Sequence, residues 1–503
     1  MKKSVKRFYA TASLLTLFSI FERGLGFLYR IALSRHLGEE GLGVYQASMS
    51  AFGVFLTIGV GGLPITISRF IAKSRAENST PSKAQTLSAG FFLSTLLSLI
   101  PALLFLLLSP WLAPAILPDE RCLPVLKILL VGSLFASAFA SLRGFFWGNK
   151  QFLIPTLFEV LEESVQVVSG IIFLSLNGKM PLIERVAWAN TLSYVLSFSA
   201  AISYFFLKQG KLASPLPLAK PLFKSSLPIT ATRLSSALLT SAVAVVFPLA
   251  LINAGLTKTE ALKIYGVITG MALPVLMLPA TVIGCISVVI SPTLSENYYR
   301  EEKQKLKRAM ENGLTVALLL ACGIIPILFT LGEEIGELIF SSRLAGEMIK
   351  TGCPMLLPMS LSMLSSSMLN SLGFSKQSFW FFLVGSTFLI LSILLLTPTA
   401  GGYAYLVGMG GSFALSAGLN LVFLQKQLPL SGKFYKNLLL VAGLLLPISL
   451  FGTMLKNLIA RFFGAVFACV SIGVGVIGFT VLLYFCHFSK KKKKIQDFFY
   501  KMR

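Results

Sequence analysis

Charged residues are scarce in this chain of 503 residues, where they make up only 13% of the sequence. A soluble globular protein carries roughly 25%, so the chain has about half the usual supply. Only 20 residues are acidic, against 41 phenylalanines and a hydrophobic content of 55%. This number of charges is too small to cover a water-exposed surface of this size. Most of the surface must therefore face lipid or other helices. A soluble enzyme and a disordered chain are both excluded.

Residues that bind metals are also few, with two histidines and six cysteines in the whole chain. The cysteines show no C-x-x-C spacing, so neither a zinc site nor a disulfide framework is expected. We interpret them as buried apolar thiols. The sequence also lacks a Walker A motif and a dinucleotide-binding fingerprint in its βαβ context. It therefore predicts no metal, no cofactor and no catalytic residue.

Long apolar segments are abundant by contrast. A helix needs about 20 largely apolar residues to cross a bilayer, and fourteen segments meet this criterion, from 9–34 and 43–70 at the start to 462–488 at the end. The basic stretch 1–7 resembles a signal peptide, but no small-residue cleavage site follows it, so the first helix is expected to remain. The sequence predicts an all-α integral membrane protein with about 14 transmembrane helices.

The positive charges give the orientation of these segments. With the N-terminus in the cytoplasm, 30 of the 44 Lys and Arg residues fall on the inner side, 11 fall on the outer side and three lie within helices. An even number of spans returns the Lys-rich tail around 490–494 to the cytoplasm. The net charge of +24 is therefore explained by topology and by attraction to anionic membrane lipids, without a nucleic-acid partner. The expected location is the bacterial cell membrane.

A weak internal repeat divides the chain. Segment 141–152 resembles segment 367–379, at an offset of about 225 residues or six spans, which keeps both halves in the same orientation. Chance similarity between two inner turns stays open as an alternative. The predicted organisation is an N-terminal six-helix lobe over 1–215, a C-terminal six-helix lobe over 216–430, and two additional transmembrane helices with a cytoplasmic tail over 431–503.

Three arginines lie within predicted spans, where each charge costs at least ~2.5–3.5 kcal/mol on insertion scales unless it faces a partner or a wet cavity. Arg23 and Arg30 are seven residues apart, so they share a helical face about 10 Å apart along its axis. Arg233 lies on the seventh span. Because the guanidinium fork suits phosphate oxygens, we expect Arg23, Arg30 and Arg233 to bind an anionic substrate such as a diphosphate.

Glutamates in the same spans are candidate partners of these arginines. Glu22 precedes Arg23, and the fifth span carries Glu159, Glu162 and Glu163 at positions i, i+3 and i+4 of one helical face. We expect Glu22, Glu159 and Glu163 to act as counter-charges or to couple transport to an ion that the sequence does not identify. The alternative is that these groups form structural ion pairs that hold the helices in register.

Several segments resemble a known family. Segments 21–45, 62–68, 142–148 and 226–233 are similar to the stage V sporulation protein B and polysaccharide transporter family, whose relatives include the lipid II flippase of the multidrug/oligosaccharidyl-lipid/polysaccharide exporter superfamily. The resemblance implies two pseudo-symmetric six-helix lobes that form a V and work by alternating access. It also implies that two extra C-terminal helices form a groove for a lipid tail, and it assigns a substrate-binding role to Arg23.

The resemblance further implies a flippase, not an enzyme. Such a protein exports an undecaprenyl-diphosphate-linked peptidoglycan precursor, similar to lipid II, or a related lipid-linked oligosaccharide, and the sporulation branch points to spore cortex synthesis. The expected partners are the lipid-linked glycan, anionic lipids and enzymes of cell-wall synthesis. Two alternatives stay open, a drug/cation antiporter of the same superfamily and a non-transporting cell-wall scaffold. A polyprenyl-dependent glycosyltransferase is disfavoured because the outer loops are short and poor in Asp.

Overall fold

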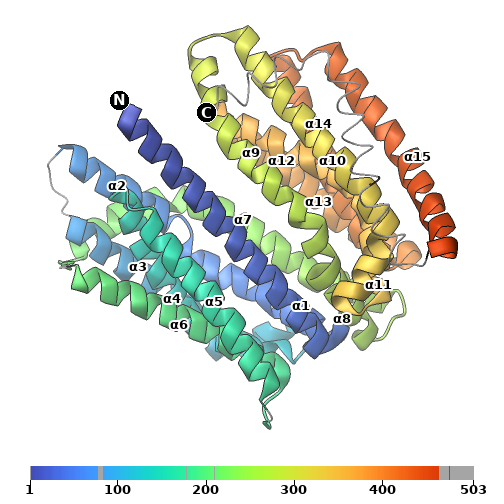
Figure 1. Cartoon of the computed structure of the whole chain (residues 1–503). Coiled ribbons are helices and arrows are strands. Elements are labelled where there is room, and N and C mark those ends of the chain that lie inside the picture. Colours follow the sequence, from blue (N-terminus) through green and yellow to red (C-terminus); the bar gives the residue numbers. More distant parts are fainter. Residues whose placement is uncertain (1, 78–82, 177, 209, 464–474, 476–503) are drawn as a thin grey trace. The chain divides into compact units, whose positions relative to one another are not determined.

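The computed structural model describes residues 2–77, 83–176, 178–208, 210–463 and 475. These residues form helices and short connections, and they contain no β-strand (Figure 1). Ten helical stretches among them are long and apolar enough to cross a membrane. The predicted class, an all-α multi-pass membrane protein, is confirmed.

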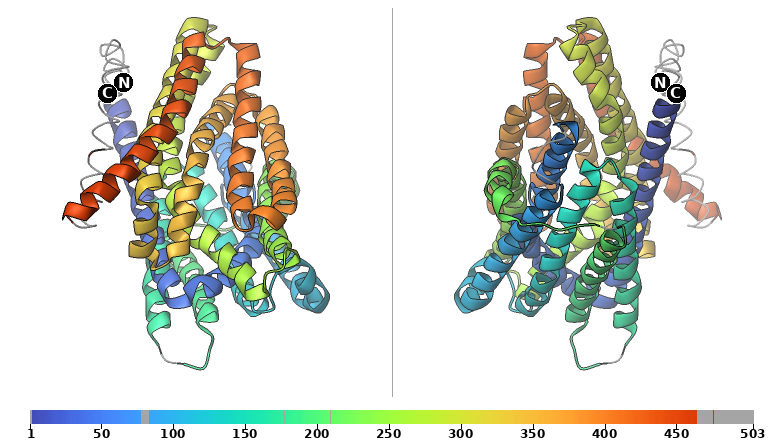
Figure 2. Two further views of the ribbon diagram at one scale, coloured as in Figure 1. Left: turned by 90° about the vertical axis from the view of Figure 1, so that its right-hand side faces the viewer. Right: turned by 90° about the vertical axis from the view of Figure 1, so that its left-hand side faces the viewer.

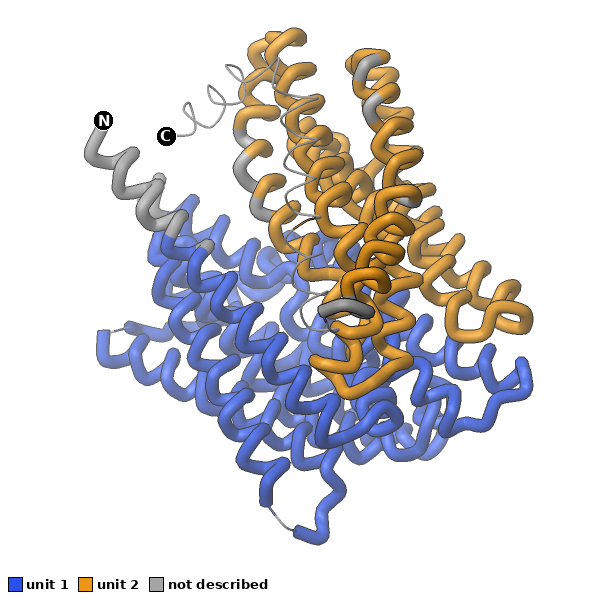
Figure 3. The backbone as a smooth tube through the Cα atoms, turned by 45° about the vertical axis from the view of Figure 1, so that its right-hand side comes forward, with its two compact units in different colours: residues 1–270 blue, residues 271–503 orange. Residues whose placement is uncertain are grey.

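The chain divides into two compact units, Met1–Gly270 and Met271–Arg503 (Figure 3). The first unit contains α1 (Lys2–Val60), α2 (Leu63–Glu77), α3 (Lys83–Ile116), α4 (Cys122–Gly148), α5 (Leu153–Ser175), α6 (Leu182–Leu207), α7 (Leu216–Asn253) and α8 (Lys258–Gly266). The π-helix η1 (Val267–Ala272) spans the division, and the second unit continues with α9 (Leu273–Tyr299), α10 (Lys303–Phe340), α11 (Arg343–Gly352), the 3₁₀ helix η2 (Cys353–Met355), α12 (Leu356–Ser371), α13 (Ser375–Ala400), α14 (Tyr403–Gln427) and α15 (Gly432–Phe463). The lobes predicted over 1–215 and 216–430 stay a prediction.

The first apolar stretch, Leu17–Ser74, has 58 residues. At 1.5 Å per residue a straight helix of that length would span about 87 Å, far more than the roughly 30 Å core of a bilayer. The helix breaks at Gly38, whose φ of 68° is in the region that glycine tolerates and side chains disfavour. This break falls between the predicted spans 9–34 and 43–70, and the stretch is long enough for two passes.

The predicted count of fourteen spans is not confirmed. Helix α5 has 23 residues but carries three glutamates, and α12 has only 16 residues. The last predicted span, 462–488, lies almost entirely outside the described residues. The number fourteen therefore stays a prediction.

Helices of the first unit pack through apolar clusters and close serine contacts. One cluster joins α2, α3 and α7, and a second joins α3, α4 and α6. Between α3 and α4, Ser98 Oγ donates a hydrogen bond of 2.7 Å to Ser137 Oγ, and Gly59 of α1 packs against both side chains. Small residues that admit close backbone contact are typical of membrane helix packing. Helices α5 and α6 form an antiparallel hairpin in both views of Figure 2.

The second unit has its own apolar core, formed by α9, α10, α12, α14 and α15. Asn420 of α14 donates hydrogen bonds to the hydroxyls of Ser365 and Ser366 on α12, at 3.1 and 2.9 Å. Large apolar side chains remain on the surface of both units, for example Trp111 at 77% exposed and Leu395 at 73% exposed. Such a surface is stable only against lipid, which agrees with a membrane location.

The two segments of the predicted repeat end their helices in the same way. After α4, Lys150 has a φ of 62°, and after α12, Gly373 has a φ of 88°. In each case the next N–H donates to a carbonyl five residues earlier, at 2.9 Å after α4 and 2.8 Å after α12. In each case a residue in the left-handed backbone conformation ends the α-helix and closes its C-terminus. The resemblance between 141–152 and 367–379 therefore extends to the local backbone.

An ion-pair network joins α1, the turn after α3, and α8. Arg121 contacts Asp119 at 3.0 Å and Glu40 at 2.6 Å, and Lys258 contacts Asp119 at 3.5 Å. Burial alone would raise the pKa of Asp119, but the hydrogen bonds and charges of Arg121 and Lys258 outweigh it, so the pKa lies below its ordinary value. The network ties the end of the first pass to the start of α8.

Candidate functional site

A cavity of about 290 Å³ lies inside the first unit, between α1, α4, α5, α6 and α7. Its charged lining consists of Glu22, Glu159, Glu162, Arg143 and Arg233. The remaining lining residues are Leu56, Thr57, Val60, Gly61, Ala136, Phe139 and Tyr194. Five ionisable groups around one small cavity are unusual inside membrane helices, where charges are expensive and mark a polar pathway or a site.

Arg143 of α4 and Glu159 of α5 form an ion pair in this cavity. Arg143 Nη1 donates to Glu159 Oε1 at 2.9 Å, and both side chains are about a quarter exposed. The guanidinium carbon lies 5.3 Å from the centre of the Trp147 ring, a cation–π arrangement. Arg143 Nε is buried and has no hydrogen-bond partner among the described residues. The pair joins α4 to α5 and leaves part of the hydrogen-bonding capacity of Arg143 unused.

Arg233 of α7 joins the cavity to the break between α1 and α2. Its Nη1 donates to the carbonyl oxygen of Gly61 at 3.0 Å, and Gly62 N donates to Thr230 Oγ1 at 2.9 Å. A Cβ on Gly62 would lie 2.6 Å from the carbonyl oxygen of Ser226, so only glycine allows this approach of α7. Within the part of the chain that the structure describes, no carboxylate pairs with Arg233. The other N–H groups of its guanidinium are available to a group bound in the cavity.

The structure brings together three of the six predicted site residues: Glu22, Glu159 and Arg233 line the cavity. Arg23 and Arg30 do not line it, although all three arginines, including Arg233, are exposed. Successive residues of an α-helix point about 100° apart, so Arg23 leaves the cavity that Glu22 enters. Arg30 lies about 12 Å farther along the helix axis than Glu22.

Glu163, the sixth predicted residue, packs against α1 outside the cavity lining. A Cβ on Gly26 would lie 2.7 Å from Glu163 Oε1, so the carboxylate sits directly against the backbone of that helix. Arg30 acts on Glu163 electrostatically. The fifth-span glutamates thus divide into two roles, with Glu159 and Glu162 in the cavity and Glu163 between helices.

Two charged lining residues, Arg143 and Glu162, were not among the predicted site residues. Arg143 lies near the end of a predicted span, where a side chain that extends to the membrane surface explains an arginine equally well. Glu162 is three residues from Glu159, and residues at this spacing lie on the same face of a helix. The sequence therefore offered a signal that Glu162 accompanies Glu159. For Arg143, no sequence signal indicated that it pairs with Glu159.

The fold is shared with solved structures of membrane transporters. The structure of the lipid II flippase MurJ in an inward closed conformation matches 94% of this chain and 99% of that chain, with a TM-score of 0.70 and 16% identity. An inward-facing multidrug resistance MATE family transporter of the MOP superfamily matches 82% of this chain and 96% of that chain, with a TM-score of 0.69 and 16% identity. The protein therefore has the fold of MOP-superfamily transporters.

The chain belongs to the family described as polysaccharide biosynthesis protein, which matches residues 9–298, more than half of its length. Among curated proteins it is similar to Stage V sporulation protein B of Bacillus subtilis (strain 168), with 28% identity over 438 residues that cover 82% of each chain. The predicted family resemblance is confirmed.

Proposed function

We propose that this protein is a flippase that moves an undecaprenyl-diphosphate-linked peptidoglycan precursor, or a related lipid-linked oligosaccharide, outward across the cytoplasmic membrane by alternating access. Spore cortex synthesis is the proposed setting, because a similar protein is named for stage V of sporulation. The family description and the flippase of the same fold support this substrate class. Cytoplasmic N- and C-termini and contacts with cell-wall enzymes belong to the same proposal.

The observation that carries the proposal is the guanidinium of Arg233 in a charged cavity between membrane helices. It forms one hydrogen bond to a backbone carbonyl, while Arg143 is neutralised by Glu159. A guanidinium with free donors binds phosphate oxygens through charge-assisted hydrogen bonds. Arg233 is therefore the proposed first contact of the diphosphate, with Arg23 and Arg30 as further contacts along the path.

The same hydrogen bond links binding to the backbone. A phosphate that recruits the Arg233 guanidinium competes with the Gly61 carbonyl, at the break where α1 ends and α2 begins. Loss of that bond frees a break that is already built from two glycines. In this proposal Glu22, Glu159 and Glu163 balance the arginine charges or take up a coupling ion.

Translocation of lipid II in proteoliposomes, with and without an imposed membrane potential, tests the proposal. We expect Arg233→Ala to abolish translocation, and Arg233→Lys to retain part of it, because lysine restores charge but not the bidentate fork. Arg69→Ala is the matched control, since Arg69 is an exposed arginine of the same unit outside the cavity. Full translocation by Arg233→Ala would remove the arginine site. No translocation of any undecaprenyl-linked substrate by the wild type would refute the flippase.

A second candidate is an antiporter for organic cations. The cavity holds three carboxylates, of Glu22, Glu159 and Glu162, and a multidrug resistance transporter has the same fold. This function predicts proton- or sodium-driven uptake of a lipophilic cation into inverted vesicles, lost in Glu22→Gln. If neither a lipid-linked glycan nor a cation moves, the remaining alternative is a scaffold in a cell-wall complex.

A further inference from the structure

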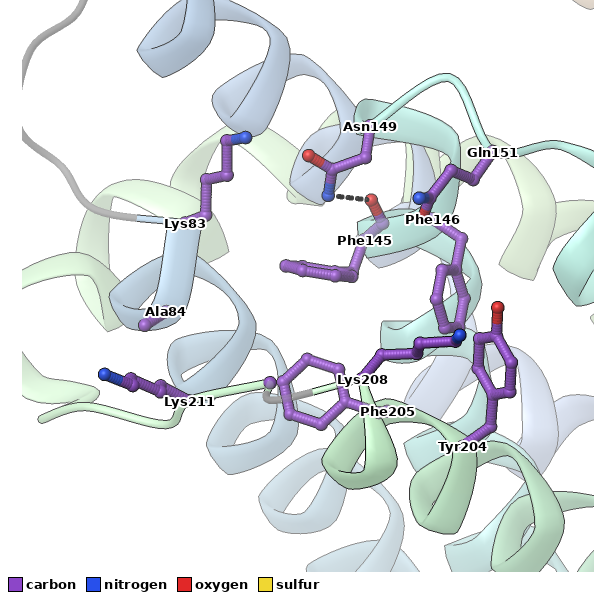
Figure 4. Close-up of a pocket in the computed structure, with 11 residues that line it drawn as sticks. Lys83, Ala84, Phe145, Phe146, Asn149, Gln151, Tyr204, Phe205, Lys208 and Lys211 are labelled. Carbon is purple, nitrogen blue, oxygen red and sulfur yellow. Dashed lines mark hydrogen bonds between the residues drawn. The ribbon is translucent and has the colours of Figure 1, made fainter.

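The first unit contains a second and larger cavity, of about 630 Å³, which shares no lining residue with the charged cavity around Arg233. It lies where α4 and α6 end and α3 begins, and segments far apart in the sequence meet there (Figure 4). Its size falls within the range of cavities that bind small molecules, roughly 300–1,000 Å³.

The lining of this second cavity is basic. Lys83, Lys208 and Lys211 line it, and none of its other described lining residues is an aspartate or a glutamate. Among the described residues, none of these lysines forms an ion pair with a carboxylate. Figure 4 shows Lys83 and Lys211 on one side and Lys208 beside the Tyr204 ring on the other, with Lys208 Nζ 5.9 Å from the ring centre. Three ammonium groups without an acidic partner give the site a net positive charge that favours an anion.

Aromatic rings form the apolar wall of the same cavity. The Phe145 and Phe205 rings meet edge to face at 5.4 Å, and the Phe146 and Tyr204 rings lie 6.1 Å apart. Gly210 packs so closely on the Phe205 ring that a side chain there would clash, so the backbone at Gly210 lies directly against this wall. Polar atoms and rings at one site suit a ligand with a charged head and an apolar body.

We infer that this cavity binds a phosphate group that is attached to an apolar body, which in this setting is the headgroup of an anionic phospholipid. Lysine ammonium groups bind phosphate as point charges, and basic residues near an anionic membrane surface attract its lipid headgroups. The aromatic wall accommodates the glycerol and the first methylenes of the chains. A soluble organic phosphate presents the same chemistry and is the second source to test. The site is independent of substrate translocation through the charged cavity.

Native mass spectrometry of the purified full chain tests this site with three probes: phosphatidylglycerol, phosphatidylcholine and soluble glycerol 3-phosphate. We expect the wild type to retain phosphatidylglycerol over phosphatidylcholine, and the double variant Lys208→Gln/Lys211→Gln to lose about tenfold or more of that affinity. The matched control is Lys220→Gln/Lys224→Gln, which removes two exposed lysines of the same unit outside the cavity. Lys208→Arg/Lys211→Arg keeps the charge and should restore retention.

The outcomes distinguish a phospholipid ligand from a soluble phosphate, and both from a cavity that binds neither specifically. Displacement of phosphatidylglycerol by millimolar glycerol 3-phosphate, or direct binding of that probe, would assign the site to soluble phosphates. Equal retention of phosphatidylglycerol by the cavity and control variants would overturn the inference, as would equal retention of the two lipids by the wild type. A thermal melt of each variant excludes loss of fold as the cause. This experiment does not measure translocation. A negative result would therefore not bear on the proposed flippase, which the proteoliposome assay tests separately.

Discussion

The ion pair between Arg143 and Glu159 should contribute measurably to stability, because it lies between membrane helices and is about three-quarters buried. We expect Arg143→Gln and Glu159→Gln to destabilise the protein separately, and the double variant to lose less than the sum of the two. Each single variant leaves the opposite charge without its partner in a medium of low dielectric, whereas the double variant leaves two neutral amides that can bond to each other.

The magnitude follows from the geometry. Breaking a fully buried pair costs about 3–5 kcal/mol, while an exposed pair is worth about 0–1 kcal/mol. The Arg143 and Glu159 side chains are 25% and 24% exposed, and the 2.9 Å bond is a single contact, not a bidentate one. The expected coupling energy of the double-mutant cycle is therefore about 1–3 kcal/mol.

The assay is reversible unfolding in mixed micelles, followed by intrinsic fluorescence, for the wild type, both single variants and the double variant. The control cycle pairs Arg143 with Glu120, an exposed residue of the same unit that lies outside the cavity lining. A coupling energy for Arg143 and Glu159 below about 0.5 kcal/mol, or no larger than that of the control cycle, would refute the reasoning.

Two further predictions concern stability. Gly62→Ala should destabilise the protein by about 1–3 kcal/mol, because the new Cβ would meet the backbone of α7 at Ser226. Gly53 has open space around it, so Gly53→Ala should be neutral or stabilising, and equal shifts in the melting temperature of the two variants would contradict this prediction. Asp119 has a lowered pKa in the folded protein. Its ionised carboxylate therefore contributes about 1–2 kcal/mol to the free energy of unfolding at any pH above the ordinary carboxyl pKa near 4. This contribution is lost as the pH falls through the lower pKa of the folded state. Asp119→Asn should therefore destabilise at pH 7 and approach the wild type once the pH falls below the folded pKa of Asp119, and Glu120→Gln, at an exposed position, should have no effect at either pH.

Much of the fold could be predicted because the hydrocarbon core of a bilayer offers no hydrogen-bond partners to the backbone. Backbone groups in lipid must be paired within the helix, so apolar length alone predicts helices that can span the membrane. Local breaks were equally accessible, since Gly38 falls between two predicted spans and Gly61 and Gly62 separate α1 from α2. These features depend on a few neighbouring residues and not on the rest of the chain.

The candidate site could be predicted only in part. Rarity of charge within spans identified Glu22, Glu159 and Arg233, which the structure brings to one cavity. The same criterion selected Arg23 and Arg30, which point elsewhere. Whether a charge on a helix enters a cavity depends on the rotation of that helix about its axis, and this rotation is set by the packing of its neighbours.

The sequence by itself thus determined that this is a helical membrane protein of a recognisable family, because hydropathy, charge bias and short motifs are local properties. Only the tertiary structure decided that Arg143 pairs with Glu159, that Arg233 contacts the break after α1, and that Lys83 meets Lys208 and Lys211 at a second cavity. Each of these contacts joins residues on different helices. Their distances depend on how the helices pack together, which no single segment encodes.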